Sequence, residues 1–331
     1  MERFALAAAV VLGFALTAAL CSLFVPLRRV LERREQQQQP VQSEQPRPAP
    51  LRAPLWGGLC AAAGTVAAVG VGWLAACVGQ PELLGSEGRL MTRLLTALAG
   101  SLAFGAVGLA EDVARMRSPA ALGLRRDLRL LLEALAAAFV LLLLRAAGCL
   151  PWGLGVPGAG YVLLGSAVPF LWAVLMVALA ECARVAERDE GAVCGAAFVA
   201  MLALMMVEAG LGVSGLAVLP AALAGALVAL GLWAFPPARL GAGCCGSLLA
   251  AGAIGCIPLS LDMTSLTVPL ALPFWAAGGL LAAQLLCAKR TGKPLRCWVK
   301  KHKMSPETVF LCSFALSAVG YVLALALLRW C

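Results

Sequence analysis

Ionisable residues that could do chemistry gather in a few polar stretches, and the first of these holds two adjacent carboxylates. Glu111 and Asp112 stand together in the stretch GLAEDVARMRS. Adjacent carboxylates at the end of a helix can bind Mg²⁺ or serve as a general base. Two acids beside several arginines also fit a solvated cluster of ion pairs, so the pair alone leaves both interpretations open.

A second charged stretch, ALAECARVAERDEGAVCG, is dense in acids and arginines. At helical spacing Glu181, Arg184 and Arg188 share one face, and Glu187 and Glu190 share another. Ion pairs three and four residues apart would neutralise much of this charge. Mutual neutralisation is therefore the simpler interpretation of this stretch taken alone.

The last polar stretch, CAKRTGKPLRCWVKKHKMSPETV, is strongly basic and contains His302, the only histidine of the chain. A basic loop at a membrane surface can bind a phosphate or a lipid headgroup. A single surface histidine by itself indicates no particular chemistry.

The segments between these polar stretches are apolar enough to cross a membrane. The chain of 331 residues is 62% hydrophobic and only 13% charged, which is typical of a membrane protein and excludes an ordinary soluble domain. About ten apolar runs are long enough to span the hydrocarbon, and none alternates like a barrel strand. We therefore predict one all-α, polytopic membrane domain over residues 1–331, with spans at 4–25, 55–78, 90–109, 128–144, 161–180, 192–212, 216–235, 244–261, 268–287 and 308–328.

The distribution of basic residues predicts how these spans are oriented. All but five of the 26 Lys and Arg residues lie in or beside the loops at 26–54, 110–127, 181–191, 236–243 and 288–307. The positive-inside rule then places five loops in the cytoplasm and both termini outside, in the cell (cytoplasmic) membrane. Orientation and attraction to anionic lipid account for the net charge of +9, so nucleic acid is not a predicted partner.

Two further features complete the organisation of the chain. Residues 35–54, EQQQQPVQSEQPRPAPLRAP, are polar and proline-rich and predict a flexible cytoplasmic linker within the membrane domain. The 13 cysteines form no Cys-x-x-Cys pair, and most fall inside predicted spans. We interpret those as small buried hydrophobic residues, with no disulfide framework.

Five short motifs follow one another at corresponding loop positions along the chain. They are PLWGG (54–58), GLAED (108–112), Gly123-Leu124 with Arg129 and Glu133, PARLGAGCCGS (237–247) and RTGKP (290–294). In this order they resemble the polyprenyl-phosphate sugar-1-phosphate transferases of glycosyl transferase family 4. That family includes phospho-N-acetylmuramoyl-pentapeptide transferase and undecaprenyl-phosphate N-acetylglucosamine-1-phosphate transferase. The resemblance covers nearly the whole chain and implies a ten-helix fold with five cytoplasmic loops.

The resemblance also implies a reaction and its residues. The family reaction is Mg²⁺-dependent, moves a sugar 1-phosphate from a UDP-sugar to a polyprenyl (undecaprenyl) phosphate, and releases UMP. In an active enzyme, the resemblance would give catalysis to Asp112, Glu111, Glu187 and Glu190, with Asp112 and Glu111 as metal ligands. It would place Arg129, Arg239, Lys293 and His302 near phosphate.

Several departures from the family pattern affect this implied site. Cys244 stands where the family has an aspartate that binds Mg²⁺, and a thiol is a poor ligand for a hard cation. Glu181 and Arg184 stand at the positions of two asparagines, and the family's histidine cluster is lost. We expect Arg184 to supply a cation where an absent metal leaves a charge hole. A soft-metal site at Cys244 and Cys245 is a further interpretation.

Two functions of different classes follow. The first is a degenerate family member without activity: a polyprenyl-phosphate-binding regulator or scaffold in peptidoglycan or cell-envelope lipid-intermediate synthesis, alone, as a homodimer or with a cell-envelope protein. The second is an active transferase in which Glu187 and Glu190 rebuild a metal site with Glu111 and Asp112. Charged residues deep within the spans would instead favour a transporter, and Glu208 is the clearest of the few.

Overall fold

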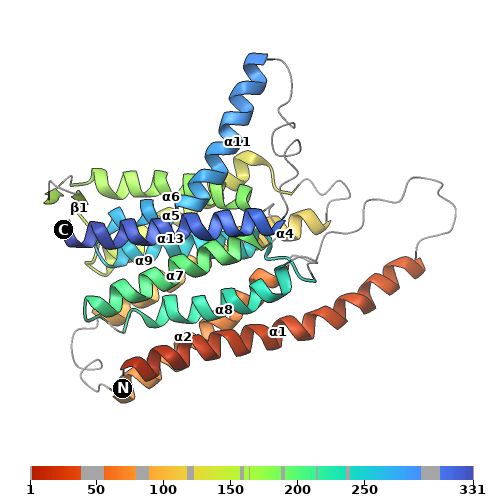
Figure 1. Ribbon diagram of the computed structural model, residues 1–331, viewed down its shortest axis with the longest axis horizontal. Coiled ribbons are helices and arrows are strands. Elements are labelled where there is room, and N and C mark those ends of the chain that lie inside the picture. The colour runs from red at the N-terminus through yellow and green to blue at the C-terminus, as the bar shows by residue number, and fades with distance from the viewer. Residues whose placement is uncertain are drawn as a thin grey trace.

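Long apolar helices make up almost all of the structure (Figure 1). The computed structural model describes residues 2–38, 56–79, 89–117, 123–156, 160–163, 165–187, 191–213, 215–235, 239–291 and 306–330. The long helices are α1 Glu2–Gln38, α2 Gly57–Gly79, α4 Arg89–Arg117, α5 Arg126–Ala146, α6 Ala167–Ala186, α7 Ala192–Gly210, α8 Val218–Ala234, α9 Gly243–Ser260, α11 Leu272–Thr291 and α13 Pro306–Trp330. The short elements are β1 Gly153–Val156, β2 Gly160–Leu163, the 3-10 helix η1 Thr264–Leu266 and α10 Thr267–Leu270.

The length and composition of these helices make the protein a polytopic membrane protein. Among the described residues, seven helices are long and apolar enough to cross a membrane, or eight if the bent pair Thr264–Leu270 and Leu272–Ala283 is one span. Each of the ten expected runs overlaps a helix, but α8 has only 17 residues and α5 carries Arg129 and Glu133 within the expected span 128–144. The all-α class is confirmed, whereas the number of spans and their orientation stay predictions.

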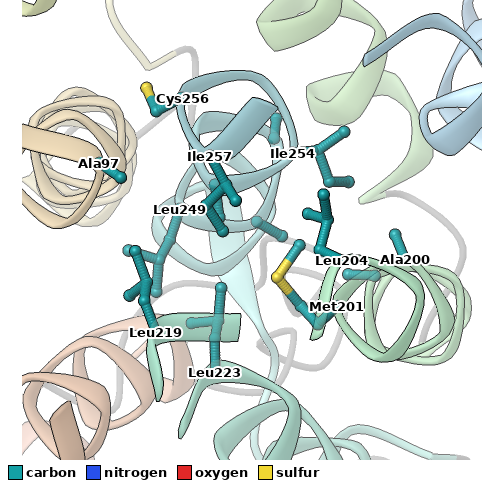
Figure 2. Packing of buried hydrophobic residues seen from close by; sticks show 14 of the residues in the cluster. Ala97, Ala200, Met201, Leu204, Leu219, Leu223, Leu249, Ile254, Cys256 and Ile257 are labelled. Atoms are coloured by element: carbon teal, nitrogen blue, oxygen red, sulfur yellow. The ribbon is translucent and has the colours of Figure 1, made fainter. Parts of the chain in front are cut away.

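Helix α9 forms the centre of the bundle. It packs against α2, α4, α6 and α7, and all of its residues are buried. Its sequence, GCCGSLLAAGAIGCIPLS, is rich in small residues, which allow neighbouring helices to approach closely where no water-driven collapse assists packing. Figure 2 shows Leu249 and Ile257 of α9 on the side of that helix that faces Leu223 of α8 and Met201 of α7. A rigid central helix therefore carries Cys244 and Cys245 in its first turn.

Three local features differ from the prediction. Strands β1 and β2 form an antiparallel hairpin in which Gly153 pairs with Leu163 and Val156 pairs with Gly160. The expected span at 161–180 therefore begins in a strand, and its helix starts at Ala167. The expected span at 268–287 is broken by a bend of 64° between α10 and α11. Helix α1 continues to Gln38, so the first residues of the expected linker are helical, while residues 39–54 lie outside the described part of the chain.

The candidate site lies where three of these helices end. Glu111 and Asp112 are near the C-terminal end of α4, Glu187 directly follows α6, and Cys244 is in the first turn of α9. Contacts between these helices bring the three ends together. The residues that the sequence analysis placed in or beside three different loops are therefore neighbours in space.

Candidate functional site

Asp112 caps the N-terminus of the central helix from a different helix. Its Oδ1 accepts the backbone N–H of Cys244 at 3.0 Å, and its Oδ2 accepts the backbone N–H of Cys245 at 2.9 Å. The first N–H groups of a helix have no partner within it, and the side chain of the N-cap residue, Ala242, supplies none here. A carboxylate at this end also interacts favourably with the helix dipole. The Asp112 side chain is fully buried, and these two hydrogen bonds fix its orientation.

Glycines bring the backbones close enough for this capping contact. A Cβ atom at Gly108 would collide with the carbonyl group of Cys244, and one at Gly58 would collide with the backbone N of Gly246. Gly243, at φ +66°, takes a left-handed conformation as the chain turns into α9. The glycine-rich loop thus serves close packing of α2, α4 and α9 around the first turn of α9.

The Cys244 thiol faces the carboxylate of Glu187, the residue that directly follows α6. Its Sγ donates to Oε2 of Glu187 at 3.0 Å, and the Cys244 side chain is fully buried. One ligand-type atom each from Asp112, Glu187 and Cys244 lies within 4.8 Å of the other two. These two oxygen atoms and one sulfur atom come from three separate elements, so only the tertiary fold assembles them.

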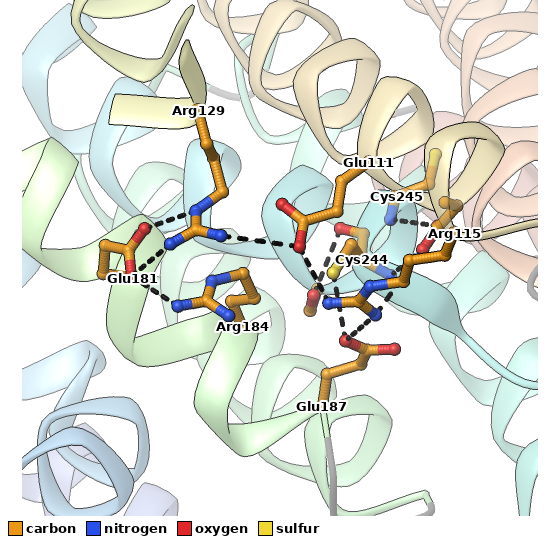
Figure 3. A network of polar contacts seen from close by, with 10 residues as sticks. Glu111, Arg115, Arg129, Glu181, Arg184, Glu187, Cys244 and Cys245 are labelled. Carbon is orange, nitrogen blue, oxygen red and sulfur yellow. Dashed lines mark hydrogen bonds and ion pairs between the residues drawn. The ribbon is translucent and has the colours of Figure 1, made fainter. Parts of the chain in front are cut away.

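The guanidinium group of Arg115 stands among three carboxylates. Its Nη2 lies 2.9 Å from Glu111 Oε1, and its Nη1 lies 3.2 Å from Glu187 Oε2 and 4.0 Å from Asp112 Oδ1 (Figure 3). The Arg115 side chain is only 22% exposed, so water weakens these ion pairs less than it would at the protein surface. Arg115 therefore supplies positive charge to the same carboxylates that the sequence offers to a metal.

A second group of ion pairs adjoins the first. Glu181 Oε1 accepts from Nε of Arg129 at 2.7 Å, and Glu181 Oε2 accepts from Nη2 of Arg184 at 2.6 Å. Arg129 Nη1 also lies 3.6 Å from Glu111 Oε1, which links the two groups into one network (Figure 3). We name the set Glu111, Asp112, Arg115, Arg129, Glu133, Glu181, Arg184, Glu187 and Cys244 the charged network.

Glu133 is the exception within the charged network. Its side chain is fully buried on α5, one turn from Arg129. Neither of its carboxyl oxygens has a hydrogen-bond partner among the described residues. A buried polar group without a hydrogen bond is unfavourable, so this residue weakens the fold unless something else satisfies it.

The donor set fits Mg²⁺ poorly. Mg²⁺ prefers an octahedron of oxygen ligands and retains several waters. Here both oxygens of Asp112 accept backbone N–H groups, the third donor is the sulfur of Cys244, and Arg115 already contacts Glu187. We therefore assign no step to Mg²⁺ in this site.

The structure places the sequence-predicted site residues unevenly. Glu111, Asp112, Arg129 and Glu187 all belong to the charged network, and Cys244 lies beside Asp112 and Glu187. Arg239 is exposed in the loop before α9, where its backbone N–H donates to the carbonyl of Trp233. The remaining three predicted positions, Glu190, Lys293 and His302, lie outside the described residues.

Arg115 is the residue of this candidate site that the sequence analysis missed. It follows Glu111 by four residues and Asp112 by three, and this helical spacing alone indicates an ion pair. We expected Arg184 to stand in the charge hole, but Arg184 pairs with Glu181 and the guanidinium among the metal-type carboxylates is that of Arg115.

Comparison with known proteins was informative at the level of the family. The family model described as glycosyl transferase family 4 matches residues 94–262, about half of the chain. This segment runs from within α4 to just beyond α9 and includes every residue of the charged network. A search of curated proteins found no match.

Proposed function

The chain belongs to glycosyl transferase family 4, and from that premise we propose that it is a sugar-phosphate transferase-like membrane protein that has lost the transfer reaction. In this proposal it binds polyprenyl phosphate and acts as a regulator or scaffold in the synthesis of cell-envelope or peptidoglycan lipid intermediates. Its partners would be the lipid and a cell-envelope protein or a second copy, with the charged network on the cytoplasmic side of the cell membrane.

The position of Arg115 is the observation that carries this proposal. Transfer of a sugar phosphate requires carboxylates that are free to hold a cation and to orient the attacking oxygen. In the structure these carboxylates already have a cation, because Arg115 lies 2.9 Å from Glu111 and 3.2 Å from Glu187. Unlike a metal ion, a guanidinium group cannot generate a metal-bound nucleophile.

The side chain at position 244 supports the same proposal. Cys244 replaces an oxygen ligand by a buried thiol whose proton is donated to Glu187. Removing one preorganised electrostatic group commonly costs a reaction about a hundredfold or more. The substitution and the Arg115 contact act on the same step, so we expect no measurable transfer.

Basic residues near the candidate site are suited to binding a phosphate group. Arg239 is exposed beside the first turn of α9, and the basic stretch at 288–307 carries the positive charge that a lipid phosphate requires. Affinity for a lipid phosphate does not require catalysis, since positive charge at the membrane surface favours the anion by itself.

An active transferase is the second candidate, and one observation favours it. Asp112 and Glu187 still converge on position 244, with their ligand-type atoms within 4.8 Å of one another. If Arg115 moved aside, these carboxylates would regain the freedom to hold a cation. In this alternative, Glu111 and Asp112 would serve as base and metal contact, with Mg²⁺ or another divalent cation as cofactor.

Release of UMP by the purified protein distinguishes the two candidates. The full chain in detergent would receive undecaprenyl phosphate, a panel of UDP-sugars, and Mg²⁺ or Mn²⁺. We expect no release. UMP release that disappears in Asp112→Asn, with that variant shown to be folded, would overturn the proposal in favour of the enzyme.

Binding of the lipid phosphate is the positive test. Undecaprenyl phosphate should raise the unfolding temperature of the protein, whereas undecaprenol, which lacks the phosphate, should not. Equal responses to both lipids, or to neither, would refute a phosphate-binding role.

A further inference from the structure

Two cysteines from different helices are in contact near one end of the bundle. The thiol groups of Cys21 on α1 and Cys60 on α2 are hydrogen-bonded to each other. Both side chains are fully buried, and both cysteines are free. A single buried cysteine is most simply a small hydrophobic residue, but two thiols in contact are also the arrangement from which a disulfide forms.

A close approach of two helix backbones supports this contact. One turn away from the thiols, a Cβ atom at Gly64 of α2 would lie 3.3 Å from the Cα atom of Thr17 on α1. Because a carbon–carbon single bond is about 1.5 Å long, the Cα atoms of Gly64 and Thr17 are no more than about 4.8 Å apart. Disulfide-bonded residues have Cα atoms about 4.4–6.8 Å apart, so the helices run at a separation that a disulfide can bridge.

The same register continues to a pair of aromatic rings. Phe24 of α1 and Trp56, the residue before α2, stack with their ring centroids 6.0 Å apart. They stand about one turn beyond Cys21 and Cys60, on the side that the positive-inside rule predicts to be cytoplasmic. Both rings are half-buried, so they cover the thiols at this end of the bundle.

We propose that Cys21 and Cys60 form a redox modification site, at which a small uncharged peroxide converts the two thiols to a disulfide between α1 and α2. One thiolate attacks the O–O bond of the peroxide and becomes a sulfenic acid, while water or an alcohol leaves. The second thiol attacks that sulfur, so that the S–S bond forms, the S–O bond breaks and water leaves. The two sulfur atoms together lose two electrons, and the peroxide gains them.

Burial of the thiols explains the choice of oxidant. A charged or bulky disulfide such as oxidised glutathione would have to separate α1 from α2 to reach the sulfur atoms, whereas hydrogen peroxide is small and neutral. Apolar surroundings disfavour the reactive thiolate, but the hydrogen bond between Cys21 and Cys60 lets the thiol of one stabilise the thiolate of the other. A thiol in contact with a second thiol also reaches the disulfide without a further oxidant.

The disulfide would link a helix of the periphery to the helices around the centre. Helix α1 packs against α2 and α8, and Cys60 is two residues from Gly58, whose backbone meets the first turn of α9. Disulfides that form on the cytoplasmic side of a cell are usually transient and report the redox state. The pair would therefore fix α1 against α2 when peroxide is present and release it when thiols are restored.

Disulfide mapping of the full chain in detergent tests the proposal. The reduced protein would receive hydrogen peroxide, its remaining thiols would be blocked with N-ethylmaleimide, and trypsin would cut it without a reductant. Residues 4–28 and 53–89 are tryptic peptides, and Cys21 is the only cysteine of the first. We expect them as one linked species that dithiothreitol separates, and Cys60→Ser should abolish it.

The second peptide also contains Cys77, which provides the matched control. Cys77 is buried on α2 near the far end of the helix, so Cys77→Ser should keep the linked species. Trp56→Ala keeps both thiols and removes half of the ring pair, so it should speed the formation of the disulfide. If Cys60→Ser fails to fold, Cys60→Ala decides, because α2 is already rich in alanine.

Three results would overturn the proposal. They are a folded wild-type protein without the linked species, a linked species that survives the loss of Cys60, and a peptide 4–28 that links instead to the peptides with Cys194 or Cys245. A rate that Trp56→Ala leaves unchanged would count against entry past the rings. These readouts involve neither UMP nor lipid, so the redox site can fail while the proposed lipid binding stands, and the reverse also holds.

Discussion

Replacing Asp112 by alanine removes the only side-chain cap that the described structure gives to the N-terminus of α9. The wild-type carboxylate accepts two backbone N–H groups, at 3.0 Å from Cys244 and 2.9 Å from Cys245. Both N–H groups lie in the buried first turn of α9, where water does not replace the lost acceptor. The variant therefore leaves two buried donors unsatisfied.

The expected loss of stability follows from these two bonds. Burial raises the pKa of Asp112 to about 7. Above that pH a hydrogen bond to this charged partner contributes about 1.5–3 kcal/mol, which gives about 3–6 kcal/mol for the pair. The net contribution of a hydrogen bond to stability is smaller in a membrane protein, because the unfolded chain in the membrane also finds hydrogen-bond partners. We therefore expect Asp112→Ala to lower the free energy of unfolding by about 3 kcal/mol. Asp112→Asn keeps one acceptor oxygen but sets its NH₂ group, a donor, against the second backbone N–H, so it should lose at least half as much.

Unfolding by SDS in mixed micelles, followed by tryptophan fluorescence, measures these differences. Glu307→Ala is the matched control, because Glu307 is an exposed acid in the first turn of α13 and should change stability by less than about 0.5 kcal/mol. A loss below about 1 kcal/mol for Asp112→Ala would refute the capping argument.

Three further predictions concern the packing and charge of the same region. Gly108→Ala should lower stability by more than about 2 kcal/mol, because the added methyl group meets the backbone of α9. Gly70→Ala has open space at the Cβ position and should be neutral or raise stability by up to about 1 kcal/mol. The same SDS titration compares the two variants, and equal effects would contradict the close approach of the backbones. Glu133→Met should stabilise the fold by about 1–3 kcal/mol, since it removes a buried carboxyl group without partners, and a destabilised variant would show that Glu133 has an unseen ligand or role. A double-mutant cycle of Arg129→Ala and Glu181→Ala should give a coupling energy of about 1–2 kcal/mol for the 2.7 Å ion pair, and a coupling within about 0.3 kcal/mol of zero would show that the pair does not contribute.

The sequence predicted the fold well where a single property decided the structure. Long apolar runs must form helices in a membrane, because helices satisfy every backbone polar group within one segment. The hairpin at 153–163 was missed because its strands are four residues each and rich in glycine, too short for an alternating pattern to stand out. The bend before α11 was missed because hydropathy does not distinguish a straight apolar helix from a broken one.

The site was predictable only to the extent that its contacts are local. The i,i+4 spacing of Glu111 and Arg115 is visible in the sequence, and so is the i,i+3 spacing of Glu181 and Arg184. The pair of Arg129 and Glu181 joins helices 52 residues apart, and no spacing rule finds it. The capping role of Asp112 was also hidden, since it depends on the closeness of α4 and α9.

The burial of α9 also has a consequence for how the protein is made. A helix surrounded on all sides by α2, α4, α6 and α7 has no face for lipid in the finished bundle, and its glycines, serines and cysteines favour lipid weakly. Its earlier neighbours emerge from the ribosome first, so α9 meets a prepared slot when it leaves the insertion machinery. A substitution that blocks the place of α9 between its neighbours, such as Gly108→Leu, should therefore lengthen the time that the nascent chain stays at the translocon. Crosslinking of stalled nascent chains to the translocon would measure this time.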